Sequence, residues 1–271
     1  MLDELTLARL ARRGEIRIGY QRHTPPFSSA VGGAFEPVGY SVDLAQAVVH
    51  RLSAVCGGPL AIVAVETTST TREAMLLAGE FDMECGSTTI TAQRRQRVAF
   101  SQPIFCTSHR VALRGSAAAN PGRTLRITGI EGSTSQAALL QEPPAGWRFE
   151  FHGQPSIGQA FDAYRFDPSL DGLVADEVIL ASLLSRAGES ATIVLDQRLG
   201  QEAYGFMLRQ ADRELLSAVD DALGHLLGSA AFQQQLVRWL PPSALGMDAR
   251  SGPVPAGQAA QAAGSAQSTI A

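Results

Sequence analysis

Short apolar strands alternate with amphipathic helices through the first hundred residues, and this alternation limits the chain to a small set of folds. Residues 15–20 and 60–65 have the composition and length of strands. A further strand is predicted at 81–85, and helices are predicted after residues 70 and 91. Between the first two strands, apolar residues recur at helical spacing at Leu44, Ala45, Val48, Val49 and Leu52. This order predicts an α/β fold in which helices flank each sheet.

The alternation is interrupted twice by extended segments, which predicts two lobes. The segment 109–114 leads into a second series of strands and helices, and the segment 203–209 ends that series. A chain of 271 residues is long enough for two modest cores, because domains commonly have about 100–200 residues. We therefore expect lobe 1 to contain residues 1–108 and 208–247, and lobe 2 to contain residues 109–207, joined by two hinge crossings.

The composition changes at the C-terminal end of the chain. Residues 248–271 consist mainly of Gly, Ala, Gln, Ser and Pro, with few large apolar side chains. Such a segment cannot bury enough apolar surface to offset the entropy that ordering would cost. We expect it to be a disordered tail.

A hydroxyl-rich turn follows the strand predicted at 81–85, and it has the features of an anion site. Ser87 and Thr89 belong to this turn, and Thr91 is placed to cap a helix whose first turn contains Arg94. A cation in a first helical turn opposes the helix dipole by roughly 0.3–1 kcal/mol, so Arg94 points to a bound anion. A carboxylate fits, because a guanidinium can bind it through two hydrogen bonds. The alternative is a solvated arginine on an ordinary helix.

A second arginine repeats this arrangement one helix earlier. Arg72 falls in the first turn of the helix predicted after residue 70, and Ser69 precedes it by one turn. Two arginines of this kind on the same lobe predict a ligand that carries two carboxylates.

The composition excludes several classes of protein. The net charge is −4 and no basic stretch is interleaved with aromatic residues, which excludes a nucleic-acid partner. All 22 lysine-plus-arginine residues are arginine, which excludes a lysine Schiff base or a phosphate-loop lysine. No membrane-spanning stretch is apparent. No cofactor or metal is expected, since Cys56, Cys85 and Cys106 lack metal or redox spacing, and a Cys85–Cys106 bridge stays open beside the prediction of small buried residues.

Two separated blocks resemble a known family. The run GSTTITAQR at 86–94 resembles the ligand signature of the family 3 periplasmic solute-binding proteins, which are receptors of polar amino acid ABC transporters. The runs FDMECGSTT at 81–89 and QEAYGFMLR at 201–209 are similar to the glutamate/aspartate-binding branch. The resemblance extends from about Leu5 to about Met247. It implies a type II periplasmic binding protein fold, in which each lobe is a mixed sheet flanked by helices and the ligand lies in the interlobe cleft.

The resemblance implies roles for the residues around the amino acid head group. Arg94 and Thr89 match the residues that hold the α-carboxylate in the glutamate/aspartate-binding branch. Ser87 matches a residue that holds the α-ammonium, and Asp176 matches the acidic partner of that group by its place after the strand 170–175. A helix N-cap aspartate would look the same, so that alternative stays open.

Other matches concern the ligand side chain and the closing of the cleft. Ser69, Arg72 and His152 match residues that hold the side-chain carboxylate, and Ser133 and Thr134 match a hydroxyl pair that closes the cleft from lobe 2. His152 is the weakest match, because the chain is longer than its relatives between this histidine and the acidic residue of lobe 2.

One departure concerns the loop after the first strand. Where the relatives present an additional arginine, this chain has Gln21, with Arg22 next to it. Glutamate or aspartate is therefore the first expectation for the ligand, and glutamine or asparagine is the second.

The resemblance implies a monomeric, non-catalytic periplasmic receptor that delivers its amino acid to the membrane permease of an ABC transporter. The native signal peptide is presumed missing, since the N-terminus lacks an apolar signal core. One alternative is an enzyme on the same scaffold, similar to the cyclohexadienyl dehydratases, with Glu131 or Glu177 as the acid. Another is a sensor domain whose tail is a linker.

Overall fold

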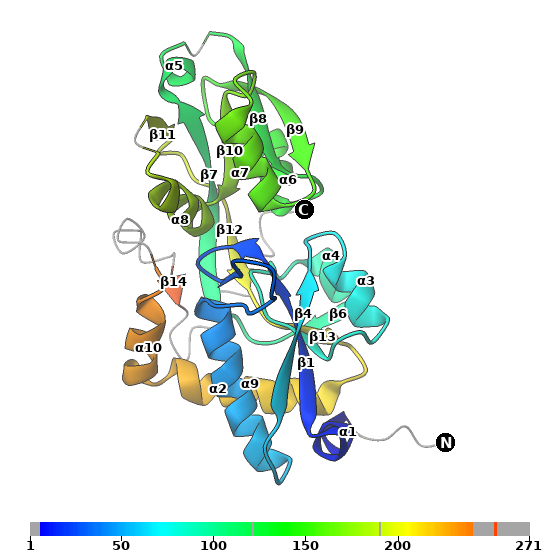
Figure 1. Cartoon of the computed structure of the whole chain (residues 1–271). Helices are drawn as coiled ribbons and strands as arrows, with labels where there is room; N and C mark the ends of the chain where they lie inside the picture. The colour runs from blue at the N-terminus through cyan, green and yellow to red at the C-terminus, as the bar shows by residue number, and fades with distance from the viewer. Residues whose placement is uncertain (1–5, 121, 190, 241–251, 254–271) are drawn as a thin grey trace.

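Two sheets lie one above the other and are joined by a pair of long strands (Figure 1). The computed structural model describes residues 6–120, 122–189, 191–240 and 252–253. The predicted α/β architecture with two mixed sheets flanked by helices is confirmed. The exact lobe boundaries stay a prediction.

The sheet of lobe 1 has five strands in the order β4-β1-β5-β13-β6. Strand β1 runs parallel to both β4 and β5, whereas β13 runs antiparallel to β5 and β6. The strands are β1 (Glu15–Gln21), β4 (Ala61–Thr67), β5 (Met83–Glu84), β6 (Val98–Phe100) and β13 (Met207–Arg209). Strand β5 is shorter than the predicted 81–85, although the backbone N–H groups of Asp82 and Cys85, on either side of it, still donate to carbonyls of β1. The hairpin of β2 (His23–Thr24) and β3 (Ser28–Ser29) follows β1.

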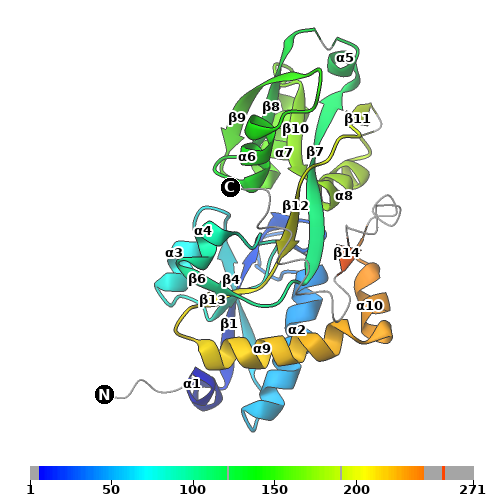
Figure 2. The ribbon, with the colours of Figure 1, turned by 180° about the vertical axis from the view of Figure 1, so that it is seen from behind.

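Helices cover both faces of this sheet. On one face the helices pack against one another and form one core with β1, in which Val48, Val49 and Val219 are buried. These helices are α1 (Thr6–Arg13), α2 (Tyr40–Val55), α9 (Arg213–Leu227) and α10 (Ala230–Val237). The opposite face carries α3 (Arg72–Leu77) and α4 (Ala92–Arg95). Figure 2 shows α9 running across the back of the lobe.

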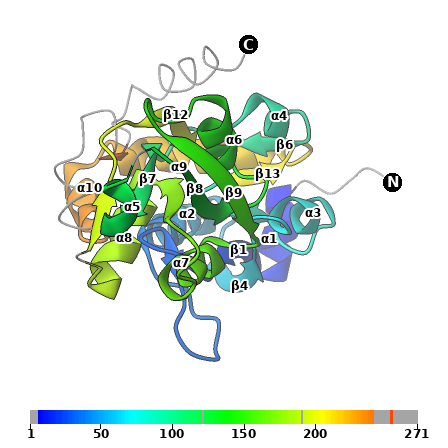
Figure 3. The ribbon, with the colours of Figure 1, turned by 90° about the horizontal axis from the view of Figure 1, so that it is seen from above.

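The sheet of lobe 2 has the order β11-β7-β10-β8-β9, with β12 and β14 also paired to β7. Its strands are β7 (Phe105–Arg114), β8 (Thr124–Ile130), β9 (Arg148–Gln154), β10 (Gly172–Asp176), β11 (Thr192–Val194), β12 (Leu199–Tyr204) and β14 (Gly252–Pro253). Its helices are α5 (Gly115–Ala118), α6 (Thr134–Gln141), α7 (Ile157–Phe166) and α8 (Glu177–Ala187). Figure 3 shows α6 and α7 on opposite sides of β8 and β9.

The two connections between the lobes are neighbouring antiparallel strands. Strand β7 pairs with β12 from Phe105–Tyr204 to His109–Leu199, and both run between the two sheets (Figures 1 and 2). The first crossing therefore begins before the predicted 109–114. The predicted return crossing at 203–209 is divided between β12 and β13. Paired crossings of this kind are expected to restrict relative motion of the lobes to a hinge.

Three sequence expectations concern cysteines, membrane spans and the tail. Cys56, Cys85 and Cys106 are all free, so the bridge that was left open does not form. Within the described ranges, none of the helices has the length and apolar character needed to span a bilayer. Most of the tail predicted to be disordered lies outside the described residues. Its described part, β14, pairs with Phe105 and Cys106.

Candidate functional site

One pocket lies between the lobes and gathers nearly all of the predicted site residues. Lobe 1 lines it with Gln21, Thr24, Ser69, Arg72, Ser87, Thr89 and Arg94. Lobe 2 lines it with the turn 130–135 and with Ile157, Ala175, Asp176 and Ile179. Ser133 and Thr134 belong to this turn, so every predicted site residue except Arg22 and His152 faces the pocket.

The pocket is closed on one side and open on the other. On the closed side, α7 lies against the β2–β3 hairpin, and a Cβ atom at Gly158 would lie only 2.9 Å from the Cβ of His23. On the open side, a larger groove continues between α3 and α4 of lobe 1 and α6 of lobe 2, and it shares Arg72, Arg94 and Thr134 with the pocket. A small ligand can therefore enter beside α3 and α6.

Arg94 is held at the edge of the pocket by the turn that precedes its helix. The Thr91 hydroxyl accepts a hydrogen bond from the Arg94 backbone N–H at 3.1 Å, which confirms the predicted N-cap. The Arg94 guanidinium Nη1 donates to the carbonyl of Thr89 at 2.8 Å. Burial and the nearby charge of Arg72 lower the pKa of Arg94 to about 10. Helix α4 has a single turn, so its dipole is small, and the case for an anion rests on the buried, mutually repelling arginines instead.

Arg72 is a buried cation without a counter-ion at contact distance. It is the first residue of α3 and is 7 % exposed. In the described part of the chain, no hydrogen bond or ion pair joins its guanidinium to another residue. Ser69, one turn earlier, donates to the Gln21 side-chain oxygen at 3.1 Å. A buried charge is costly unless it is paired, so Arg72 is prepared for an anionic or strongly polar ligand group.

Asp176 ends β10 and faces the pocket from lobe 2. Its side chain does not cap helix α8, which removes the alternative N-cap explanation for this residue. Instead, Oδ2 accepts a hydrogen bond from the Tyr204 hydroxyl at 2.5 Å, and Oδ1 lies 2.6 Å from Nδ1 of His109. The carboxylate is thus held in place from two sides.

His109 and Glu202 were not predicted, and they form the base of the cleft. His109 is 1 % exposed, and its Nε2 lies 3.0 Å from Glu202 Oε1. Burial alone would lower the pKa of His109, but Glu202 and Asp176 raise it to about 10, so the imidazole is protonated. For Glu202, burial by itself would raise the pKa, but His109 and the hydroxyls of Thr89 and Thr134 lower it. The Thr89 hydroxyl donates to Glu202 Oε2 at 2.7 Å.

Among the described residues, one group of side chains could in principle hold a metal ion. It consists of His109, Asp176 and Glu202, whose potential ligand atoms lie within 4.8 Å of one another. A metal ligand must be deprotonated, whereas this imidazole is protonated and lies between the two carboxylates as their shared counter-ion. The cluster therefore acts as an ion-pair network across β7, β10 and β12.

Glu84 is a second carboxyl group, after Glu202, that the sequence did not single out. It is 0 % exposed and lies on β5 behind the pocket wall. The Thr88 hydroxyl donates to its Oε2 at 2.6 Å, while Oε1 lacks a hydrogen-bond partner of ordinary geometry among the described residues. Burial raises the pKa of Glu84, and the positive charge of Arg72 acts against this.

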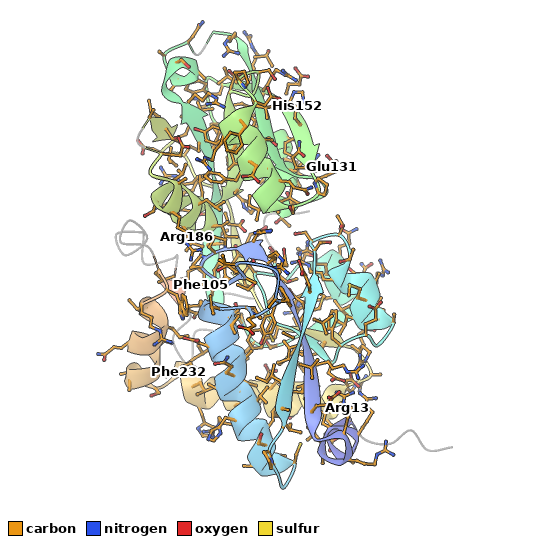
Figure 4. All side chains as sticks on the ribbon, in the orientation of Figure 1. Arg13, Phe105, Glu131, His152, Arg186 and Phe232 are labelled. Carbon is orange, nitrogen blue, oxygen red and sulfur yellow. The ribbon has the colours of Figure 1, made fainter. Side chains whose placement is uncertain are left out.

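The structure does not bring Arg22 and His152 together with the other residues. The Arg22 guanidinium binds the Glu66 carboxylate, with an Nε to Oε1 distance of 2.8 Å, and stacks over Phe35. His152 lies on β9, where its Nε2 accepts a hydrogen bond from Arg126 Nε at 3.0 Å. Figure 4 shows His152 well above the edge of lobe 2 that faces lobe 1.

The two carboxyls considered for catalysis differ in availability. Glu177 is buried, and its carboxylate binds Arg110 and Arg198, so it holds lobe 2 together. Glu131 is exposed at the lobe edge that faces lobe 1, where Figure 4 labels it, and its Oε1 accepts from Gln136 at 3.3 Å. Neither carboxyl group is both buried and free of a cationic partner, as a general acid positioned in a cleft would be.

The three site residues that were not predicted, Glu84, Glu202 and His109, differ in how strong a signal the sequence carried for them. Glu84 and Glu202 lie inside the two family-like runs at 81–89 and 201–209, so the sequence carried a signal for both. His109 lies outside these runs, and only the pairing of β7 with β10 and β12 places it between two carboxylates.

Proteins of known function resemble the chain over most of its length. A glutamate/aspartate import solute-binding protein of Salmonella typhimurium is 28 % identical over 257 residues, which cover 90 % of this chain and 83 % of the relative. A glutamine-binding protein of an ABC transporter from Bacillus subtilis is 24 % identical over 240 residues, which cover 87 % of this chain and 84 % of the relative.

The fold is shared with solved structures as well. The crystal structure of an ancestral amino acid-binding protein, a precursor of cyclohexadienyl dehydratase, superposes with a TM-score of 0.73 at 23 % identity, and the match covers 87 % of this chain and all of that one. The family profile described as bacterial extracellular solute-binding proteins, family 3, matches residues 16–242. Since this match spans most of the chain and both lobes, the protein belongs to family 3 of the bacterial extracellular solute-binding proteins.

Proposed function

We propose that the protein binds one L-amino acid in the interlobe pocket and delivers it, as a monomeric periplasmic receptor, to the permease of an ABC transporter. The observation that carries this proposal is the placement of opposite charges on the two lobes. Arg94 of lobe 1 and Asp176 of lobe 2 face the same pocket, as the α-carboxylate and α-ammonium of one amino acid require. Thr89 and Ser87 supply hydroxyls beside them. The names of the relatives support an amino acid as the ligand.

The ligand that suits this pocket best is L-glutamate or L-aspartate. Arg72 is buried, and none of the described residues gives it a counter-ion at contact distance, so a second carboxylate would gain a charge-assisted pair there. Glutamine and asparagine are the second candidates, because the Gln21 oxygen beside Ser69 can accept a hydrogen bond from a carboxamide. The glutamine-binding relative supports keeping this second possibility.

The mechanism that fits two lobes and one bridging ligand is a population shift. Groups on lobe 1 and lobe 2 can hold the same amino acid only when the cleft is closed, so the ligand stabilises the closed form. The permease would then recognise that form. A dehydratase activity is not favoured, because Glu177 is paired with two arginines and Glu131 is exposed.

A thermal-shift screen of the twenty common amino acids tests this function directly. Ligand binding to the native state raises stability by about 2.7 kcal/mol at a hundred times the dissociation constant. We expect the largest increases in melting temperature with glutamate and aspartate. No increase with any amino acid, or an increase with arginine and histidine only, would contradict the proposal.

Replacing Arg72 by glutamine should change specificity more than overall binding. The variant removes the cation that faces the side-chain carboxylate, and losing a buried charged partner costs about 2–5 kcal/mol. The affinity for glutamate and aspartate should therefore fall by at least about 30-fold, and the affinity for the amides by less than about tenfold, in isothermal titration calorimetry. The exposed Arg51 offers a matched control, whose replacement by glutamine should leave both unchanged. Equal losses for acids and amides would show that Arg72 does not contact the ligand side chain.

A further inference from the structure

We propose that Glu84, which lies behind the pocket and does not line it, determines the net charge of the ligand that the pocket accepts. In this proposal Glu84 takes up a proton when a dicarboxylic amino acid binds, and it stays ionised when the corresponding amide binds. The inference rests on the proposed function, because it concerns an amino acid held by Arg94 and Arg72. It assigns a role to a carboxyl group that has no direct contact with the ligand.

The hydrogen bonds around Glu84 do not fix its charge state. Its strand β5 is covered by β1 on one side and by β13 on the other, with Gly19 and Met207 opposite Glu84. An ionised carboxylate can accept about four hydrogen bonds. Thr88 supplies one, at 2.6 Å, and the nearby Gln21 side chain also favours the carboxylate, although Oε1 receives no hydrogen bond of ordinary geometry within the described residues. The space beside Oε1 is kept by Gly86, where a Cβ atom would lie 2.5 Å from that oxygen.

Nearby charges therefore decide whether Glu84 is ionised. The charged groups that act on it are Arg72 from α3 and Arg94 from α4, and both favour the carboxylate, whereas burial favours the neutral acid. Two other titratable groups adjoin it, Tyr20 on β1 and Cys85 next in the chain. Burial raises the pKa of both well above its usual range, so both are neutral near pH 7. A ligand carboxylate on the arginines would cancel the charges that keep Glu84 ionised.

The charges of the other pocket groups match this exchange. Apart from the exposed Glu131, whose charge is solvated, three cations, Arg72, Arg94 and protonated His109, lie at the pocket and its adjoining groove with two carboxylates, Asp176 and Glu202, which leaves an excess of one positive charge. Ionised Glu84 cancels this excess, and a neutral amino acid amide then fits without a net buried charge. Protonated Glu84 leaves the excess in place, and a singly negative acid then neutralises it. A net charge in a desolvated pocket is disfavoured, so ligand charge and Glu84 protonation should be coupled.

His109, Arg94 and Glu202 should not titrate in the same range. The pKa of His109 is about 10 and that of Arg94 is about 10, while the pKa of Glu202 is lowered. Between about pH 6 and about pH 8.5 these groups keep their charge. Proton uptake that accompanies binding of an acid in this range is therefore attributable to Glu84.

Calorimetry in two buffers of different ionisation enthalpy measures the protons taken up on binding. Near pH 7.5 we expect glutamate or aspartate to take up a sizeable fraction of one proton and glutamine or asparagine to take up close to none. The affinity ratio of acid to amide should fall as the pH rises, by up to about tenfold per pH unit, because one proton is linked to binding of the acid. Equal proton uptake for acid and amide, or none for the acid, would overturn the inference.

Two variants separate Glu84 from other carboxyl groups of the cleft. Glu84→Gln keeps the shape and removes the titration, so it should bind the acids without proton uptake and without this pH dependence. Glu131→Gln removes an exposed carboxyl of the same pocket and should keep the wild-type proton uptake. Unchanged uptake in Glu84→Gln would overturn the assignment, and if this variant does not fold, the wild-type measurements decide alone. Failure of all four amino acids to bind would overturn the proposed function and the inference together, whereas binding without uptake would overturn the inference only.

Discussion

Replacing Arg94 by alanine should abolish amino acid binding and leave the fold intact. Arg94 faces the pocket, and its burial beside Arg72 lowers its pKa to about 10, so the guanidinium is held in a partly desolvated place that a ligand carboxylate would neutralise. Truncating one partner of a buried charge pair costs about 2–5 kcal/mol or more, which corresponds to a loss of about 30-fold to several thousand-fold in affinity. Titration calorimetry with glutamate measures this loss directly.

The neighbouring Arg95 provides the control for this variant. Arg95 belongs to the same short helix α4 but is exposed and does not line the pocket. Arg95→Ala should therefore bind with wild-type affinity. Both variants should unfold within a few degrees of the wild type, because the Arg94 side chain makes one hydrogen bond to the described residues, to the Thr89 carbonyl, and its removal relieves the repulsion with Arg72. Wild-type affinity in Arg94→Ala would show that the α-carboxylate binds elsewhere.

Replacing His109 by leucine should be among the most destabilising single changes in this chain. The imidazolium is the counter-ion of both Asp176 and Glu202, and leucine would leave two carboxylates close together without a cation. Removing one partner of a buried ion pair typically costs 3–5 kcal/mol. Urea unfolding followed by circular dichroism should show a loss of about this size. The exposed His50→Leu control should change the free energy of unfolding by less than about 0.5 kcal/mol.

The same network predicts how stability depends on pH. The pKa of His109 is about 10 in the folded chain and about 6.5 in an unfolded one, so the native state binds more protons between these values. The stabilisation from His109 is therefore fully present below about pH 6.5 and is lost as the pH rises toward 10. We expect the free energy of unfolding to decrease over this window in the wild type, and to decrease less in His109→Leu. The same decrease in both proteins would mean that another group is responsible.

Local sequence patterns were sufficient where the chain contacts mostly its own neighbours. The spacing of Val48 and Val49 predicted the buried face of α2, and Thr91 was recognised as an N-cap because a cap bonds to an N–H three residues ahead. Ser133 caps α6 in the same way, since its hydroxyl accepts from the Gln136 backbone N–H at 3.1 Å. Contacts of this range depend on spacing along the chain alone.

The pairing partners of the strands that cross between the lobes could not be predicted from local sequence patterns. An extended run such as 109–114 predicts a strand but does not say how far it pairs or with which partners. In the structure, β7 pairs with β10, β11, β12 and β14. The pairing with β12 extends to Phe105, so β7 begins there and not at residue 109. His152 illustrates the same limit, since strand alternation on β9 and the pairing with β8 turn its side chain toward Arg126.

The sequence by itself thus determined the α/β class, the two lobes, the family resemblance and most of the side chains that line the pocket. These follow from periodicity and from short runs such as 86–94, in which neighbouring residues act together. Only the tertiary structure decided that His109 lies between Asp176 and Glu202, that Arg72 has no counter-ion at contact distance in the described part of the chain, and that Glu84 is buried behind the pocket. The physical reason is that charge state and desolvation depend on every group within several ångströms, and strands distant in sequence bring those groups together.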